Sequence, residues 1–182
     1  MTIEEIFSKL VAHMKKGVMI HNQISIMYGF LDLCGYQKCH EYHYFSESKN
    51  CKCVQNYYLE HYNKLVPEEP FEKPDLIPSN WYKHTKHDVD VNVKRSTVKE
   101  LVKAWVDWET ETKKDLEIYY KELYDMGEIC AATKIMFFLK DVDKELKKAK
   151  HKYLKLETLG YDIKDIIGEQ KTLYKKYKEK ME

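Results

Sequence analysis

The sequence has few of the residues that interrupt helices. Its 182 residues include only six Gly and four Pro, and all four Pro fall between positions 67 and 78. Charged residues make up 34% of the chain and hydrophobic residues 43%. Long stretches of this composition without Gly or Pro are typical of surface-charged helices rather than of sheets or disordered segments. The composition therefore favours an all-α fold.

Arginine is almost absent, because Arg95 is the one arginine among 31 basic residues. Arginine recognises bases and phosphates in a bidentate manner, and lysine replaces it poorly in that role. The formal net charge is +1, so the chain as a whole has no strong field that attracts nucleic acid or anionic membranes. Both observations argue against sequence-specific DNA recognition.

Long apolar runs are also missing. The longest apolar block is IMFFL at 135–139, far short of the 18 or so residues that a membrane-spanning helix needs. The first residues do not have the pattern of a signal peptide. We therefore expect a cytoplasmic protein with no membrane contact, whose five Cys are reduced thiols rather than a disulfide framework.

Apolar residues recur at helical spacing in the first third of the chain. Thr2 and Glu5 have the spacing of a capping box, and the pattern that follows predicts a helix to about Leu33. Gly35 then interrupts the pattern, and 36–64 reads as a second helix.

Three further helices are predicted after the proline cluster. Ser96 is a plausible N-cap for the third helix, which carries Trp105 and Trp108 on its apolar face and ends at Gly127. The fourth helix runs to Gly160, and a shorter fifth helix follows. The fourth helix is expected to bury Ile129, Ile135, Met136, Leu139, Val142, Leu146, Ala149 and Tyr153, and the fifth Ile163, Ile166, Ile167, Leu173 and Tyr177.

The predicted architecture is one all-α domain over 1–182, a bundle of four long helices with a shorter C-terminal helix. Residues 1–64 form a helical hairpin, 65–95 a connector and 96–182 a three-helix segment. The connector contains all four prolines and several acidic residues, so we expect an extended crossover between the second and third helices.

The stretch CGYQKCHEYHYFSESKNCKC at 34–53 is the strongest candidate for a metal site. On a helix, Cys39 could share a face with His43, or His40 with His43 and Glu47. These pairs and triplets supply two or three ligands, whereas a structural zinc site needs four, so another helix would have to contribute. Buried thiols and hydrogen-bonded histidines are the simpler interpretation, and we predict no metal and no cofactor.

The segment WVDWETETKKDLEIYYKELYDMGEICAATKIMFFLKDVDKEL resembles the third and fourth helices of the ferritin-like fold. That fold builds its di-metal site from a Glu on each of two helices and a Glu-x-x-His on each of the others. Here His21 stands where the first helix would need Glu, Glu47 is followed by Asn50, and Glu109 and Asp141 are the candidates from the last two helices. No Glu-x-x-His occurs in the chain. The resemblance thus implies a ferritin-like bundle that lacks its metal ligands.

Other catalytic patterns are missing as well. The chain has no Gly-rich phosphate loop, no GxSxG and no HExxH. The sequence therefore predicts a protein that is not an enzyme.

A second resemblance covers most of the chain. The runs MTIEEIFSKLVAHMKKGVMIHNQ, GYQKCHEYHYFSES, HYNKLVPEE, WYKHTKHDVDVN, ETKKDLEIYYKELYDMGEICAA and DVDKELKKA are similar to small helical proteins of clostridia and their phages or other mobile elements. That group includes type II anti-CRISPR proteins. The resemblance implies a non-enzymatic inhibitor that binds the Cas9–guide RNA complex and impairs target-DNA binding or cleavage.

Charge and aromatic residues offer surfaces for such a partner. Cas9 holds nucleic acid in a positively charged channel, which acidic segments could occupy, and the Lys-rich helices after residue 140 could contact guide RNA. The predicted partner-binding residues are Glu68, Glu69, Glu72, Asp75, Trp81, Tyr82, Asp107, Glu111 and Asp115. Trp81 has an alternative position, folded back over the end of the bundle. Two other functions stay open, a ferritin-like metal-binding protein and a structural helix bundle, and the oligomeric state is not predicted.

Overall fold

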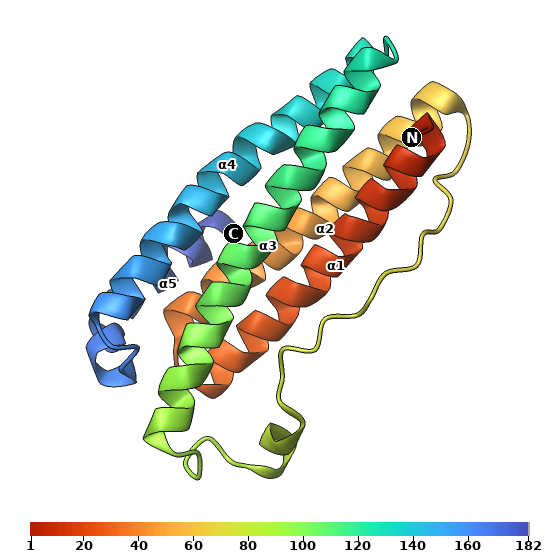
Figure 1. The fold of residues 1–182 in the computed structure, drawn as a ribbon. Helices are drawn as coiled ribbons and strands as arrows, with labels where there is room; N and C mark the ends of the chain where they lie inside the picture. Colours follow the sequence, from red (N-terminus) through yellow and green to blue (C-terminus); the bar gives the residue numbers. More distant parts are fainter. Residues whose placement is uncertain (182) are drawn as a thin grey trace.

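Five α-helices form the protein in the computed structural model, which describes residues 1–181 (Figure 1). No strand occurs among those residues. The elements are α1 (Ile3–Phe30), α2 (Cys34–Tyr62), a 3-10 helix η1 (Ser79–Lys83), α3 (Val91–Asp125), α4 (Ile129–Thr158) and α5 (Ile163–Met181). The predicted all-α bundle of four long helices and a shorter fifth is confirmed.

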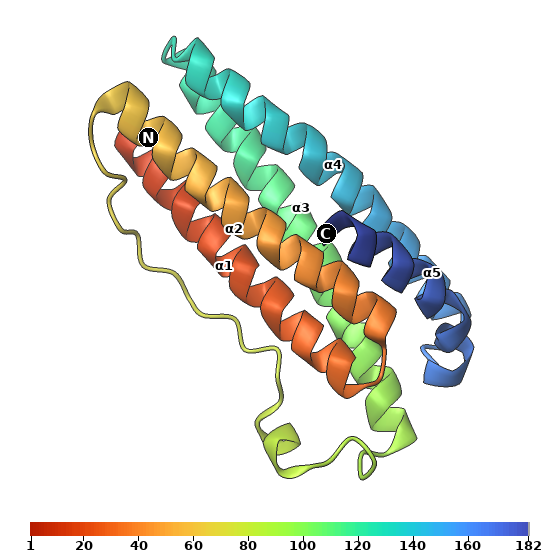
Figure 2. The same cartoon turned by 180° about the vertical axis from the view of Figure 1, so that it is seen from behind.

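The helices are arranged as two hairpins joined by a long crossover. α1 and α2 form the first hairpin and α3 and α4 the second, and the chain between α2 and α3 runs along the outside of α1 for most of the bundle's length (Figure 1). α2 and α3 therefore run in the same direction. α5 turns back from the end of α4 and lies between α2 and α4 over one half of the bundle (Figure 2).

Two N-caps decide where α1 and α3 begin. Thr2 accepts a hydrogen bond from Glu5 N (3.1 Å) and its own N–H donates to the Glu5 carboxylate (2.8 Å), so the predicted capping box is present. The Ser96 prediction is wrong, because α3 starts earlier, with Asp90 accepting from Asn92 N at 2.8 Å. Ser96 lies inside the helix and donates to the Val93 carbonyl. Aspartate caps as well as serine does, and nothing between the two positions breaks a helix.

Gly35 belongs to α2 rather than interrupting it, so the second helix begins two residues earlier than predicted. Its role is close packing. A Cβ at this position would lie 2.4 Å from the carbonyl oxygen of Gln170 in α5 and 2.8 Å from its Cα. The Gly35 N–H also donates to the Gln170 side chain at 3.2 Å. The missing side chain therefore allows α5 to pack against the start of α2.

The apolar face of α3 is buried as predicted, including Trp105 and Trp108. On α4 the prediction fails for Ile129 and Met136, which are exposed, and on α5 it fails for Ile167. α5 reaches only one half of α4 (Figure 2), so apolar side chains near the start of α4 have less of the bundle to pack against. No described helix is long and apolar enough to span a membrane, and all five cysteines are unpaired.

Candidate functional site

Titratable side chains from four helices meet in the middle of the bundle. They are His21 of α1, His40, His43 and Glu47 of α2, Glu109 of α3 and Glu145 of α4, and we call them the polar centre. His21 and His40 are fully buried, and Glu109 is 3% exposed. Ionisable groups are rarely buried to this degree unless they are paired or bind a metal. The polar centre is thus a cluster of buried ionisable groups inside a mainly apolar core.

Polar contacts connect α1, α2 and α3 within the centre. The Trp105 indole N–H donates to Glu109 Oε1 at 3.1 Å. The same oxygen lies 3.9 Å from His21 Nε2, and His21 Nδ1 is 3.0 Å from His40 Nδ1. In that last contact one ring donates and the other accepts. The three helices are therefore joined by a chain of polar groups that reaches no solvent.

Several atoms in this region have no hydrogen-bond partner. They are Nε2 of His21, His40 and His43 together with Oε2 of Glu145, all of them buried. His43 Nε2 lies 3.6 Å from Glu145 Oε2, beyond hydrogen-bond range. A buried polar atom without a partner costs about 1–3 kcal/mol, so each calls for a physical explanation such as a bound ion or water.

A cavity of about 210 Å³ opens beside these groups. Glu47, Glu109, Glu145 and His43 line it, together with Asp141 of α4. Carboxylates from α2, α3 and α4 therefore converge on one space that is large enough for a cation and several waters.

Burial changes the protonation of the carboxyls. It raises the pKa of Glu109 to about 8, and the neighbouring charge of Glu47 adds to this effect. Burial likewise raises the pKa of Glu47 to about 7; this residue is half-buried overall, with its carboxyl group inside the bundle. Without a cation, Glu109 is therefore largely protonated at neutral pH.

Burial has the opposite effect on the histidines. The pKa values of His21, His40 and His43 lie well below the ordinary value, mainly because of burial and further because each ring is close to another. All three rings are neutral at physiological pH, so each has one nitrogen lone pair. The ring that accepts in the His21–His40 contact uses its lone pair there, which leaves the other ring of that pair and His43 able to bind a metal ion.

No family model matches the chain, and no curated protein matches it. Among solved structures, an engineered closed form of the Archaeoglobus fulgidus ferritin superposes with a TM-score of 0.75. The match covers 94% of this chain and 93% of that one, at 12% identity. The chain has the ferritin-like fold. At this identity the likeness extends to the fold alone.

The ferritin-like bundle does not reproduce the di-metal ligand set of its fold. α1 contributes Leu10, His13 and Met14 to the cavity and no carboxylate. On α2, Asn50 instead of His follows Glu47 after three residues. The two Glu-x-x-His pairs that a dinuclear centre requires are therefore missing, and the residues present do not fit a ferroxidase centre. The donors that are present at the cavity, a few carboxylates and the imidazoles of His13 and His43, suit a single cation.

The sequence indicated part of this arrangement. His40, His43 and Glu47 share one side of α2, as helical spacing allows, and the two histidines are buried. Glu145 was missed, although it lies one turn after Asp141 on α4 and lines the same cavity. Sequence periodicity shows which residues share a face of one helix but not which face of another helix they meet.

Trp81 is placed differently from the other predicted partner-binding residues. It is 5% exposed and its ring packs edge-on against Phe30 with centroids 5.1 Å apart. Of the two positions considered for Trp81, the structure has the one that covers the end of the bundle, and the prediction of a surface anchor is wrong. The neighbouring Tyr82 is 77% exposed.

The acidic connector is exposed but partly anchored. Glu68, Glu69, Glu72 and Asp75 all face solvent. Near Asp75, the Gln23 side chain donates to the Pro74 carbonyl (2.7 Å) and accepts from Leu76 N (2.8 Å), which fixes the chain against α1. This stretch of the connector is therefore held in place rather than open.

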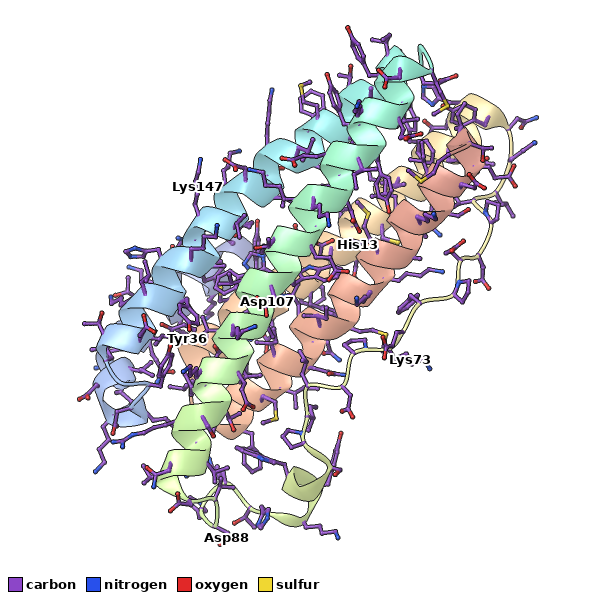
Figure 3. All side chains as sticks on the ribbon, viewed as in Figure 1. His13, Tyr36, Lys73, Asp88, Asp107 and Lys147 are labelled. Carbon is purple, nitrogen blue, oxygen red and sulfur yellow. The ribbon has the colours of Figure 1, made fainter. Side chains whose placement is uncertain are left out.

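The acidic residues predicted on α3 each have a basic neighbour. Asp107 pairs with Lys103, Glu111 lies 3.4 Å from Lys16, and Asp115 lies 3.3 Å from His13. Figure 3 shows Asp107 and His13 on neighbouring helices. Potential ligand atoms of His13, Glu111 and Asp115 lie within 4.8 Å of one another, closer than any three in the polar centre.

That closely spaced group is a weaker metal site than the polar centre. Its carboxylates are on the surface, whereas Glu109 of the polar centre is buried. His13 Nε2 is hydrogen-bonded to Thr112 at 2.8 Å. None of its three side chains is buried without a partner, so no ion is needed to satisfy them.

Proposed function

We propose that this ferritin-like bundle binds one divalent transition-metal ion at its polar centre and does not catalyse a reaction. The observation that carries the proposal is the convergence of Glu47, Glu109, Glu145 and His43 on one cavity in the bundle. Two of the atoms there, His43 Nε2 and Glu145 Oε2, have no hydrogen-bond partner. This is the opposite of the expectation from sequence that no metal is bound.

A cation would offset the repulsion between the carboxylates at the cavity. Glu47 and Glu145 both raise the pKa of Glu109 by like-charge repulsion in addition to its burial, and a dication between carboxylates replaces that repulsion with attraction. Carboxylate and imidazole ligands together suit ions such as Zn²⁺, Mn²⁺ or Fe²⁺. Because Glu109 and Glu47 must release protons to bind, affinity increases as the pH rises.

Titration of the chelator-treated protein with Zn²⁺ and Mn²⁺ by calorimetry tests this proposal. We expect one ion per chain, with proton release. Glu109→Gln and Glu145→Gln should each weaken binding by about 100-fold, since ligand loss costs at least as much as loss of a supporting residue. Glu111→Gln is the matched control and should leave affinity unchanged. No binding would contradict the proposal, and so would binding that only Glu111→Gln abolishes.

The exposed connector supports a second candidate, an inhibitor that binds guide-loaded Cas9. Glu68 makes one long ion pair, to Lys15 at 3.7 Å, and Glu69 and Glu72 make none within the described chain. These carboxylates are therefore free to meet a basic surface. Charge complementarity of this kind accelerates association and selects partners.

A DNA-cleavage assay with rising amounts of the protein tests the second candidate. Cleavage by guide-loaded Cas9 should disappear near equimolar protein and be indifferent to chelator. A Glu68→Gln, Glu69→Gln and Glu72→Gln triple variant should inhibit less, because steering to the basic channel is weakened. The control triple Glu60→Gln, Glu157→Gln and Glu179→Gln removes the same charge elsewhere. Failure to bind Cas9 from several lineages would contradict this function.

A further inference from the structure

A second cavity, of about 390 Å³, lies between α4 and α5 against α2 and α3. Tyr36, Trp105 and Tyr177 form an aromatic floor, and all three are at least nine-tenths buried. Trp105 is shared with the polar centre, because its indole N–H bonds Glu109. The cavity falls within the range of about 300–1,000 Å³ that is usual for small-molecule sites.

The rim of this cavity is cationic. Lys147, Lys148 and Lys152 follow one another along α4, and Lys176 faces them from α5. Figure 3 shows Lys147 extending from the outer edge of α4, with Tyr36 further inside the bundle. The aromatic floor provides an apolar surface. The ammonium groups above it provide hydrogen-bond donors, and an ammonium group itself has no acceptor.

The acidic neighbours of these lysines do not neutralise them. Asp143 accepts from Lys147 at 2.7 Å but also from Lys113 at 2.8 Å. Glu169 is likewise shared, between Lys152 and Lys155. Each carboxylate thus serves two cations, and the rim keeps an excess of positive charge.

Of the remaining two lysines, one adds to that excess. Lys148 is paired with Glu145 at 2.5 Å, and the other oxygen of Glu145 faces the neutral His43, so Lys148 is neutralised. Lys176 has no acidic partner in the described chain and lies 5.3 Å from the centre of the Tyr177 ring. The pKa of Lys152 is lowered, first by burial and then by repulsion from Lys155 and Lys176, which agrees with an unbalanced positive field.

We propose that this cavity binds a small organic anion with an aromatic body, its ring against Trp105 and Tyr177 and its negative group between Lys147 and Lys176. The ring gains stacking and buried apolar area. The anion gains charge-assisted hydrogen bonds from Lys176, which has no acidic partner in the described chain, and from Lys147, which shares Asp143 with Lys113. A carboxylate, sulfonate or phosphate ester fits the same chemistry. The proposal does not require a bound metal, although Trp105 also donates to Glu109 of the polar centre.

Two fluorescent probes that differ in one charge test the proposal on the full chain. They are 8-anilinonaphthalene-1-sulfonate and its uncharged counterpart N-phenyl-1-naphthylamine. We expect the sulfonate to bind one to one with energy transfer from tryptophan, and the neutral probe to bind at least about tenfold more weakly. The double variant Lys147→Gln with Lys176→Gln should weaken sulfonate binding by about tenfold or more.

A matched double variant, Lys150→Gln with Lys175→Gln, removes the same charge from the same helices outside the cavity and should bind the sulfonate normally. Equal binding of the two probes would show a merely apolar surface and overturn the proposal. If both double variants lost the same sulfonate affinity, the effect would depend on net charge alone, and the proposal would again be overturned. Binding of single-stranded RNA through Lys147 and Lys176, without sulfonate binding, would mean an open nucleic-acid surface instead.

Discussion

The chelator-treated protein is expected to lose on the order of 2–3 kcal/mol of stability when the pH rises from 6.5 to 8.5. The folded-state pKa values of Glu109 and Glu47, about 8 and about 7, lie above those of the unfolded chain, near 4.5. Over this interval the unfolded carboxyls are already ionised while the folded ones still hold protons. Stability therefore falls with pH until the folded pKa values are passed.

The buried histidines act in the opposite sense below this interval. Their folded pKa values lie well under 6.5, so their contribution is fully present above pH 6.5. As the pH falls below 6.5, these histidines become protonated in the unfolded chain but stay neutral in the folded one, so the free energy of unfolding decreases. The two effects together place the stability maximum of the metal-free protein near pH 6.5.

Urea unfolding of Glu109→Gln across the same pH range isolates the carboxyl effect. Gln keeps an acceptor for the Trp105 N–H but has no proton to lose, so the alkaline decline should fall to about a third and the variant should exceed the parent in stability at pH 8.5. Glu111→Gln, at an exposed position, should retain the full decline. An unchanged slope in Glu109→Gln would mean that its carboxyl is not protonated in the fold.

Replacing Gly35 with Ala is expected to destabilise the fold by about 2–3 kcal/mol. The added methyl would lie 2.4 Å from the Gln170 carbonyl oxygen, and a backbone atom inside a packed helix cannot move aside as a flexible side chain does. α5 must therefore shift away from α2. The expected result in urea is a lower unfolding midpoint, with faster amide hydrogen exchange over 163–181.

Gly168→Ala provides the matched control in α5. A Cβ there meets nothing within 4 Å, so the only effect is the better helix propensity of Ala, a gain of about 0.5–1 kcal/mol. The two substitutions thus have opposite expected signs. A stabilising Gly35→Ala would mean that α5 does not pack on α2 as closely as described.

How much the sequence could predict differs between the fold and the site. The bundle follows from local signals, since apolar periodicity defines each helix and Pro67 to Pro78 exclude a helix in the connector. Ser96 was predicted as the N-cap because the apolar stripe is clear only after it, and a helix can begin before its buried face does. Gly35 is needed for the close packing of α5 on α2 and does not break a helix.

The polar centre depends on distances between helices, which periodicity does not contain. The spacing of His40, His43 and Glu47 fixes a shared face of α2, but Glu109 and Glu145 reach it only through the packing of the second hairpin. Trp81 illustrates the same limit. Its position beside an exposed connector indicated a surface residue, and its contact with Phe30 depends on how η1 folds against the end of α1.

The crossover has a mechanical consequence. It divides the bundle into two hairpins, α1–α2 and α3–α4, which the chain connects only through residues 63–90 (Figures 1 and 2). The polar centre lies between the two hairpins. The first hairpin contributes His21, His40, His43 and Glu47, and the second contributes Glu109 and Glu145. A group bound there would contact both hairpins at once and would hold them together.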